Sequence, residues 1–294
     1  GSVMLSCAVS RFTISGDWNE FIYHNLAKPF SLGAVYMSFF LLFALFNLGN
    51  PALMPKKSGL KMALFLFFLL LLLLSASKLM IGVGLPLLGW HYRAFILKNH
   101  RKKLLWFVSI FILLSVGAVP FFKRTQFLLH PKLETVNSAS FKSVPEPNGL
   151  TLRLILWRFG LEIMQEQKAW FWGVGMSHSQ PLLNDKIAGY GMYTGTHDGS
   201  DTGYLNYNYH NQFVETSLRA GLPGLVILIA ILLIFARQRR ENLFAPKLFM
   251  LLIAGFFITE SVLERQAGII FFCLVFSAFF TNDNHVASTH DRKE

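Results

Sequence analysis

Long uncharged apolar runs recur along this chain and limit what it can fold into more than any other feature. A run of roughly 17 to 25 apolar residues is long enough to cross a bilayer as a helix. Of all residues, 53% are hydrophobic and 30 are Phe. The runs lie at Phe30–Pro55, Met62–Ser77, Leu79–His91, Leu104–Phe122, Ala220–Ala236 and Gln266–Asn282. The sequence therefore predicts an all-α polytopic membrane protein.

The basic residues indicate how these helices are oriented. The net charge is +11, which in a soluble chain would indicate nucleic-acid binding. Here Lys and Arg gather in short clusters beside the apolar runs, as in cytoplasmic loops of membrane proteins, so no nucleic-acid partner is expected. The clusters are Lys56, Lys57 and Lys61; residues 93–103; and Arg237, Arg239, Arg240 and Lys247.

An even number of crossings must separate any two cytoplasmic clusters. With an external start, seven crossings satisfy all of them. This topology depends on the hairpin around Lys78, whose first arm is near the lower limit of about 17 residues for a membrane-spanning helix. If one long tilted helix took the place of the hairpin, every later segment would lie on the opposite side of the membrane. The expected crossings are residues 30–49, 62–77, 79–97, 104–120, 212–236, 246–260 and 266–281.

This topology divides the chain into five parts. An external start with an odd number of crossings also indicates that helices of a longer protein precede residue 1. We expect an extracytoplasmic connector at 1–29, four transmembrane helices within 30–120, an external catalytic loop at 121–211, three transmembrane helices within 212–281 and a cytoplasmic tail at 282–294.

The polar segment between Lys123 and Arg219 begins irregularly and then shows helical periodicity. Residues 121–150 contain Pro, Asn, Gly and Ser and are typical of a surface segment. Residues 151–170 predict an amphipathic helix that lies flat on the bilayer, with Arg153 and Arg158 on its flanks. Its apolar positions are Leu152, Ile155, Leu156, Phe159, Ile163 and Met164. The aromatic run at 170–172 then leads into a glycine turn that returns the chain to the membrane interface.

Residues 187–209 are rich in Gly, Tyr, Asn and Asp. Such residues supply turns, flat apolar faces and amide hydrogen bonds, as a sugar-binding surface does. Tyr207, Tyr209 and Asn211 are therefore assigned to substrate binding; a loop packed by its own aromatic side chains is the alternative. Asp198 and Asp201 lack the spacing of a calcium loop and favour a solvated turn.

His210 lies directly before an apolar run, so its ring is expected at the outer boundary of the membrane. Histidine can accept a proton from an attacking hydroxyl near neutral pH. Arg153, with Lys78 from the hairpin turn on the same face, can bind a diphosphate as it leaves. A structural histidine, and a lysine that merely reaches the interface, are the simpler alternatives. The sequence has no convincing pair of metal-binding carboxylates here, so we expect no metal and no cofactor.

The order of several short motifs resembles the O-antigen ligase and polymerase superfamily, from Lys78 onward. None of these motifs is specific alone; their order and their expected external placement carry the resemblance. They are Arg153-x-x-x-Trp157, Gly173-Val174-Gly175, His210-Asn211-Gln212-Phe213, Gly221-Leu222-Pro223-Gly224 and Glu260-Ser261-x-x-Glu264-Arg265-Gln266-x-Gly268.

The resemblance implies a metal-independent, inverting, GT-C-like glycosyltransferase in the bacterial inner membrane, with a periplasmic catalytic loop. Its partners would be an undecaprenyl-diphosphate-linked glycan, a lipid A-core or other acceptor, and membrane lipids. His210 matches the family's essential loop histidine and Arg153 its loop arginine, both catalytic, while Arg158 would bind substrate. Ser75-Ala76-Ser77-Lys78 departs from the usual motif, which ends in Arg, so Lys78 would bind phosphate without a two-pronged geometry. Glu260 and Glu264 would order the loop or satisfy an ion pair.

Three classes of function remain open. A ligase is the leading hypothesis, and a polymerase or a protein O-oligosaccharyltransferase would use the same donor. A transporter or flippase would carry polar residues at the membrane midplane on interrupted helices. The ionisable residues here lie at the edges of the apolar runs, which favours an enzyme.

Overall fold

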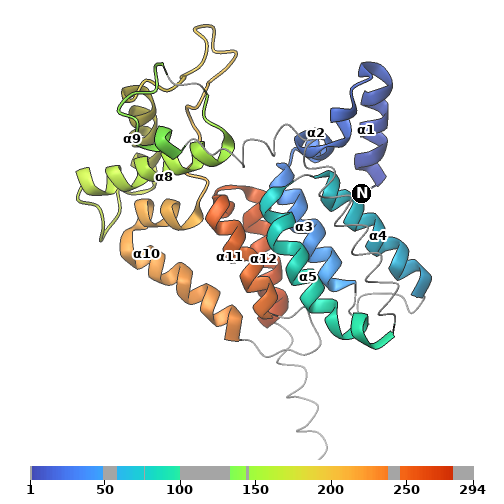
Figure 1. Cartoon of the computed structure of the whole chain (residues 1–294). Helices are drawn as coiled ribbons and strands as arrows, with labels where there is room; N and C mark the ends of the chain where they lie inside the picture. Colours follow the sequence, from blue (N-terminus) through green and yellow to red (C-terminus); the bar gives the residue numbers. More distant parts are fainter. Residues whose placement is uncertain are drawn as a thin grey trace, which may run out of the picture. The chain divides into compact units, whose positions relative to one another are not determined.

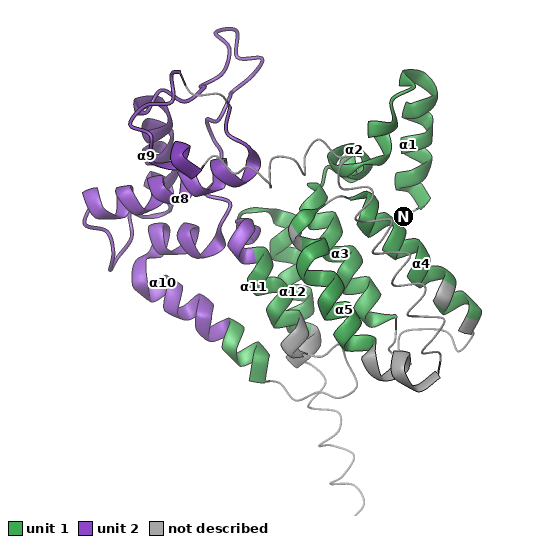
Figure 2. Cartoon of the chain, in the orientation of Figure 1, with its two compact units in different colours: residues 1–94, 232–256, 263–294 green, residues 95–231, 257–262 purple. Residues whose placement is uncertain are grey.

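Helices make up all of the regular structure in the described part of this computed structural model, which confirms the expected all-α class. The structure describes residues 2–48, 58–75, 77–99, 133–143, 146–237 and 246–280. The chain forms two compact units (Figure 2). The first comprises residues 1–94, 232–256 and 263–294, and the second comprises residues 95–231 and 257–262.

The first unit is built around phenylalanine. Phe39 of α3 packs on Phe256 of α11, with ring centroids 4.7 Å apart, and Phe40 lies equally close to Phe271 of α12. This unit contains α1 (Ser2–Ser15), η1 (Trp18–Phe21), α2 (Tyr23–Ala27), η2 (Lys28–Phe30), α3 (Ala34–Asn47), α4 (Ser58–Leu74), α12 (Gln266–Phe280) and most of α5 (Lys78–Asn99) and α11 (Pro246–Thr259) (Figure 1). The many Phe residues thus form an interlocked aromatic core.

The expected break beside Lys78 is present, because α4 ends at Leu74 and α5 begins at Lys78. Phe65 of α4 and Tyr92 of α5 have ring centroids 5.7 Å apart. These positions lie on either side of the break, so α4 and α5 fold back on each other as a hairpin. Lys78 is exposed at the start of α5.

The second unit holds α8, α9 and the first part of α10. The described elements in this region are η3 (Leu133–Asn137), α8 (Gly149–Glu166), α9 (Met176–Gly189), α10 (Gln212–Arg237) and η4 (Val262–Glu264), the last at the boundary with the first unit. α8 begins where the side chain of Asn148 accepts hydrogen bonds from the amides of Leu150 and Thr151. The amphipathic helix expected at 151–170 is therefore present, with slightly earlier bounds.

The apolar face of α8 is not available to a lipid surface. Ile155, Phe159 and Ile163 are at most 1% exposed and form one core with Leu183 of α9 and Tyr209. The expectation that this face rests on the bilayer is wrong, because an apolar helix face can be buried by protein as well as by lipid, and here α9 and the following loop cover it.

Helix length does not confirm seven crossings. Within the described residues, α10 alone is both long and apolar enough to cross a membrane, and α2 to η2 together with α3 would pass as a second, bent span. α3, α4, α11 and α12 have 14, 17, 14 and 15 residues, which is short for a bilayer core about 30 Å thick. The crossing expected at 104–120 lies outside the described residues.

Candidate active site

His210 lies two residues before the start of α10 at Gln212. Its backbone has a φ of 48°, an uncommon conformation for a residue with a side chain. Two interactions hold it there: its amide donates to Asn208 Oδ1 over 3.0 Å, and the next residue, Asn211, caps α10 by accepting from the amides of Phe213 and Val214. The chain therefore turns sharply at His210 and fixes its ring at the beginning of the helix.

Glu260, which follows the last residue of α11, lies between His210 and Arg153. Its Oε2 is 3.2 Å from Nδ1 of His210, and its Oε1 is 2.8 Å from Nη2 of Arg153. Arg153 also donates from Nε to the carbonyl of Thr259 and from Nη1 to that of Gly149. One carboxylate thus joins a histidine and an arginine that are far apart in sequence.

The charge of Glu260 determines which nitrogen of His210 can act. Burial would raise the pKa of Glu260, but the hydrogen bond and charge of His210 and the adjacent Arg153 hold that pKa below its usual value. Glu260 is therefore ionised at neutral pH and can only accept a hydrogen bond. When the imidazole is neutral, Nδ1 of His210 therefore carries the proton and Nε2 presents a lone pair.

A second buried carboxylate supports this pair from behind. Glu215 of α10 is 1% exposed, and its Oε2 accepts from the Ser261 hydroxyl and the Tyr209 amide. The Ser261 Oγ in turn accepts from the amide of Asn211, and Arg219 forms an ion pair with Glu215. This network fixes the residues adjacent to both His210 and Glu260, so the pair is held rigidly.

The tyrosine and asparagine residues assigned to substrate binding separate into two groups. Tyr207 is exposed, and its ring lies edge-on to that of His210 at 6.0 Å, where a substrate can contact it. Tyr209 is 1% exposed, packs on Gly160 of α8 and places its hydroxyl 3.4 Å from the carbonyl of Ser179. Tyr209 and the capping Asn211 therefore have structural roles, and their assignment to substrate binding stays a prediction.

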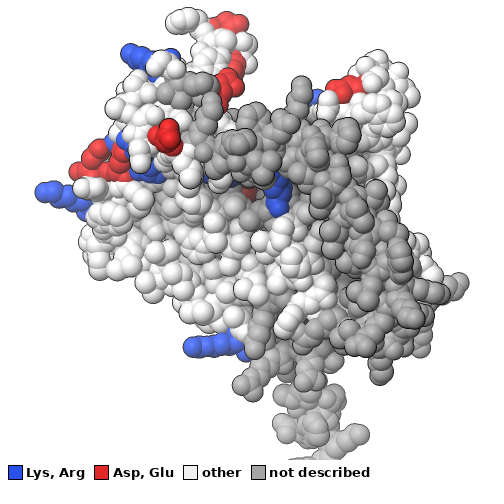
Figure 3. Space-filling view, in the orientation of Figure 1, with Lys and Arg blue, Asp and Glu red and all other residues white. Residues whose placement is uncertain are grey.

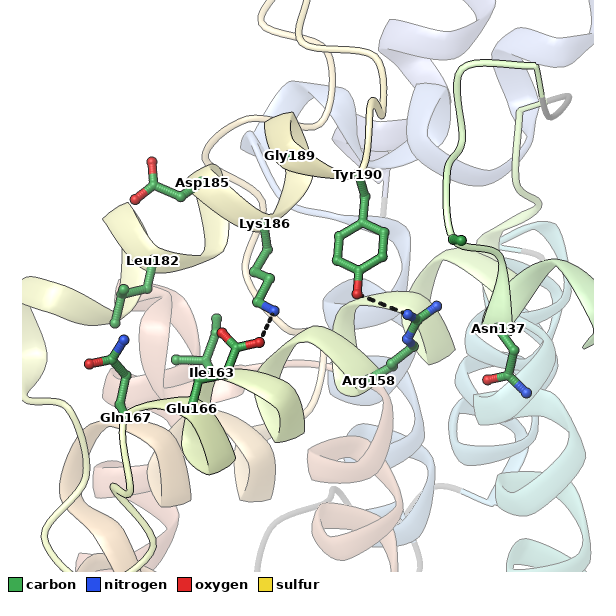
Figure 4. Close-up of a pocket in the computed structure, with 11 residues that line it drawn as sticks. Asn137, Arg158, Ile163, Glu166, Gln167, Leu182, Asp185, Lys186, Gly189 and Tyr190 are labelled. Atoms are coloured by element: carbon green, nitrogen blue, oxygen red, sulfur yellow. Dashed lines mark hydrogen bonds and ion pairs between the residues drawn. The ribbon is translucent and has the colours of Figure 1, made fainter.

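Arg158 is not part of the site. It pairs with Glu162 and donates to the carbonyls of Val136 and Ser138 and to the hydroxyl of Tyr190. Beside it, Lys186 of α9 forms ion pairs with Glu162 and Glu166. Arg158, Glu166 and Lys186 line a cavity of about 600 Å³ (Figure 4). Arg158 is five residues from Arg153 on a helix, so its side chain points in another direction. Its donors tie the segment at 133–138 to α8. The assignment of Arg158 to substrate binding stays a prediction.

This cluster predicts a pH-dependent stability. Burial opposes the charged forms. The hydrogen bonds that Glu162 accepts from Lys186 and Arg158 nevertheless lower the pKa of Glu162, and the hydrogen bonds that Lys186 donates to Glu166 and Glu162 raise the pKa of Lys186. The contribution of Glu162 to the free energy of unfolding is therefore complete above its ordinary pKa of 4.5 and is lost as the pH falls. The contribution of Lys186 to that free energy is complete below its ordinary pKa of 10.5 and is lost as the pH rises. We expect Lys186→Met to weaken the α8–α9 contact by about 1 kcal/mol at pH 7.

Amide hydrogen exchange of α9 at neutral and at strongly acidic pH measures this effect. The difference between Lys186→Met and the unchanged chain is expected to shrink in acid. Lys142→Met is the matched control, because Lys142 is exposed and has no ion pair in the described part of the chain. An equal difference at both pH values would contradict an electrostatic origin.

Lys78 belongs to the first unit, whereas His210, Arg153 and Glu260 belong to the second. Its role in phosphate binding stays a prediction. Within the residues described, no group of three or more His, Cys, Asp or Glu side chains could hold a metal ion.

Glu260 as the partner of His210 was missed by the sequence analysis, which assigned it only to loop order or to an ion pair. The two residues are separated by 50 positions. The available signal was its position at the end of an apolar run, where an acidic side chain is costly unless it is paired.

The comparison with protein-family models identifies the class. Residues 62–229 match the model of the O-antigen ligase family. Because this match covers more than half of the 294 residues, the chain belongs to the O-antigen ligase family. Members of this family are glycosyltransferase-like enzymes, typically found in membranes. No individually curated protein matches the chain significantly.

Proposed function

We propose that this protein is an O-antigen ligase, which transfers a glycan from undecaprenyl diphosphate to a lipid A-core acceptor. The observation that carries this proposal is the contact between His210 and Glu260 beside Arg153, in a chain of this family. A histidine oriented by a buried carboxylate is a common arrangement for a general base.

In the proposed reaction, a hydroxyl oxygen of the acceptor attacks the anomeric carbon of the donor glycan. The bond from that carbon to the diphosphate oxygen breaks, and its electron pair leaves with the diphosphate, so the configuration inverts. The hydroxyl proton passes to Nε2 of His210. Glu260 accepts a hydrogen bond from Nδ1–H, which keeps its proton, and the carboxylate stabilises the positive charge that develops on the ring.

Arg153 has two tasks in this proposal. It holds Glu260 in place, and it assists the departing diphosphate. Its Nε, Nη1 and Nη2 atoms each make one hydrogen bond, so two of its N–H groups remain for phosphate oxygens. Lys78 would add a second cation. These charges would perform the task that other transferases give to a divalent metal, so the reaction is proposed to be metal-independent.

We propose that the reaction takes place at the periplasmic face of the inner membrane. α10 is the described helix best suited to span it, and His210 lies at the polar end of that helix. The residues 121–211 would then form the periplasmic loop that carries Arg153 and His210. Membrane lipids would surround the apolar helices.

Lipopolysaccharide gel profiles of a strain that lacks this gene test the choice of acceptor. We expect loss of all glycan-capped chains, restored by the full-length gene. A profile in which a single repeat unit still caps the core would indicate a polymerase instead, and an unchanged profile would indicate another acceptor, such as a protein. Transfer in isolated membranes should also continue when EDTA is present.

A further inference from the structure

Three aromatic residues stand exposed between α8 and α9. Trp170, Phe171 and Trp172 are 55%, 53% and 77% exposed, and Met176 beside them is exposed as well. Large apolar side chains are rarely grouped in this way on a water-facing surface without a partner. The apolar face of α8 is buried, so this aromatic loop, residues 170–172, is the exposed apolar part that follows it.

The aromatic loop is fixed to α10 by the backbone. The amide of Leu222 donates to the carbonyls of Trp170 and Phe171, and the amides of Val174 and Gly175 donate to those of Leu218 and Arg219. Gly173 and Gly221 face each other so closely that a Cβ on Gly173 would lie 2.7 Å from the Gly221 nitrogen. The loop therefore cannot move independently of α10.

These bonds meet α10 where it bends at Gly221 (Figure 1). Beyond the bend, an exposed apolar stripe continues along the helix at Leu222, Val226, Ile229 and Leu233. On the face shown in Figure 3, the surface over this part of α10 carries no charged side chain except at the C-terminal end of the helix, whereas charges gather over α8 and α9. The aromatic loop and the stripe are thus adjacent parts of one apolar surface.

The length of α10 places the bilayer boundary at the bend. The residues from Leu222 to Arg237 extend about 24 Å at a rise of ~1.5 Å per residue, slightly less than a hydrocarbon core of about 30 Å. Because even this whole segment is shorter than the core, α10 can cross only if the boundary lies no farther along the helix than the bend. The boundary must then lie at the aromatic loop, where Trp side chains are favoured because they have both an apolar body and a polar N–H.

We propose that residues 170–172 anchor the second unit in the headgroup region of a phospholipid bilayer. Because the loop is bonded to the bend of α10, it sets how far His210 and Glu260 stand above the membrane. The contribution to catalysis rests on the proposed function, whereas the contact with lipid does not.

Depth-dependent fluorescence quenching tests the contact. The full chain, with Cys7→Ser and Cys273→Ser, receives one NBD label through Trp172→Cys and is reconstituted in vesicles of phosphatidylethanolamine and phosphatidylglycerol. Headgroup-level nitroxide lipids should quench this label at least about twofold more than mid-chain nitroxides, because aromatic belts lie at the headgroup level. The control label, through His197→Cys in the exposed loop at 193–204, should be quenched by aqueous iodide instead.

Equal quenching of both labels by iodide would overturn the proposal. A second result would also overturn it: the Trp172→Cys label is protected from iodide, but this protection is lost when the protein is diluted at constant lipid. That loss would mean that a second copy of the chain, and not lipid, covers the loop. In a parallel arm, Trp170→Ala with Trp172→Ala should reduce transfer in vesicles about tenfold through misplacement of the site, and Trp170→Tyr with Trp172→Tyr should retain it. If the label lies at headgroup depth but the full-length gene restores no glycan transfer to the deletion strain, the proposed function fails and the lipid contact stands.

Discussion

Replacing His210 by Ala is expected to reduce glycan transfer by about 10² to 10⁴-fold, the usual contribution of a general base. Nε2 of this ring is the nitrogen left to accept the acceptor proton once Nδ1 is hydrogen-bonded to Glu260. Transfer from a purified lipid-linked donor to lipid A-core, at saturating concentrations of both, measures this loss as a change in kcat.

The partner residue allows a graded comparison. Glu260→Gln keeps a hydrogen-bond acceptor for Nδ1 but removes the negative charge, so we expect a smaller loss than for His210→Ala. The double variant, His210→Ala with Glu260→Gln, should lose little more transfer activity than His210→Ala alone, because the effects of substituting residues that act as one unit are not additive. His197→Ala is the control, since that histidine lies in an exposed loop. Near-normal transfer by His210→Ala in a folded protein would refute the proposed base.

Gly221→Ala is expected to destabilise the second unit by about 2 to 4 kcal/mol. Gly221 has φ 63° and ψ −161°, a conformation essentially restricted to glycine. A Cβ there would also collide with the carbonyl group of Phe171. The collision cannot be relieved cheaply, because that same carbonyl accepts the hydrogen bond of the Leu222 amide. Thermal unfolding in detergent measures the loss.

Gly189→Ala provides the comparison for this prediction. Gly189 is the last residue of α9, and no atom lies within 4 Å of an added Cβ. Alanine is favoured over glycine in a helix, so this variant should be neutral or slightly more stable. Equal unfolding temperatures for Gly221→Ala and Gly189→Ala would mean that the bend tolerates a side chain, contrary to the structure.

Local sequence patterns were sufficient for several features of the fold. The break before Lys78, the start of α8 and the place of His210 directly before α10 each depend on residues that are close in sequence. The difference between Tyr207 and Tyr209 could not be predicted in this way. Both tyrosines follow an asparagine, and only the space above Gly160, on a distant helix, determines that Tyr209 is buried.

The sequence also could not predict what covers an apolar helix face. An amphipathic pattern gives the direction of the apolar face of α8 but not what covers it, since lipid and protein satisfy it alike. The same limit applies to the seven expected crossings. A short apolar run predicts a helix, but its final length and its neighbours decide whether that helix can span a bilayer.

The second unit is discontinuous in sequence, and this affects how the protein can be divided for experiments. Its short return segment at 257–262 contributes Glu260 and Ser261, both beyond residue 229, where the family match ends. A fragment cut to the matched region, or to the polar segment alone, would retain His210 and Arg153 but lose the carboxylate that joins them. A soluble excised loop is therefore an unsuitable substitute for the enzyme, and a minimal active fragment must extend past Ser261.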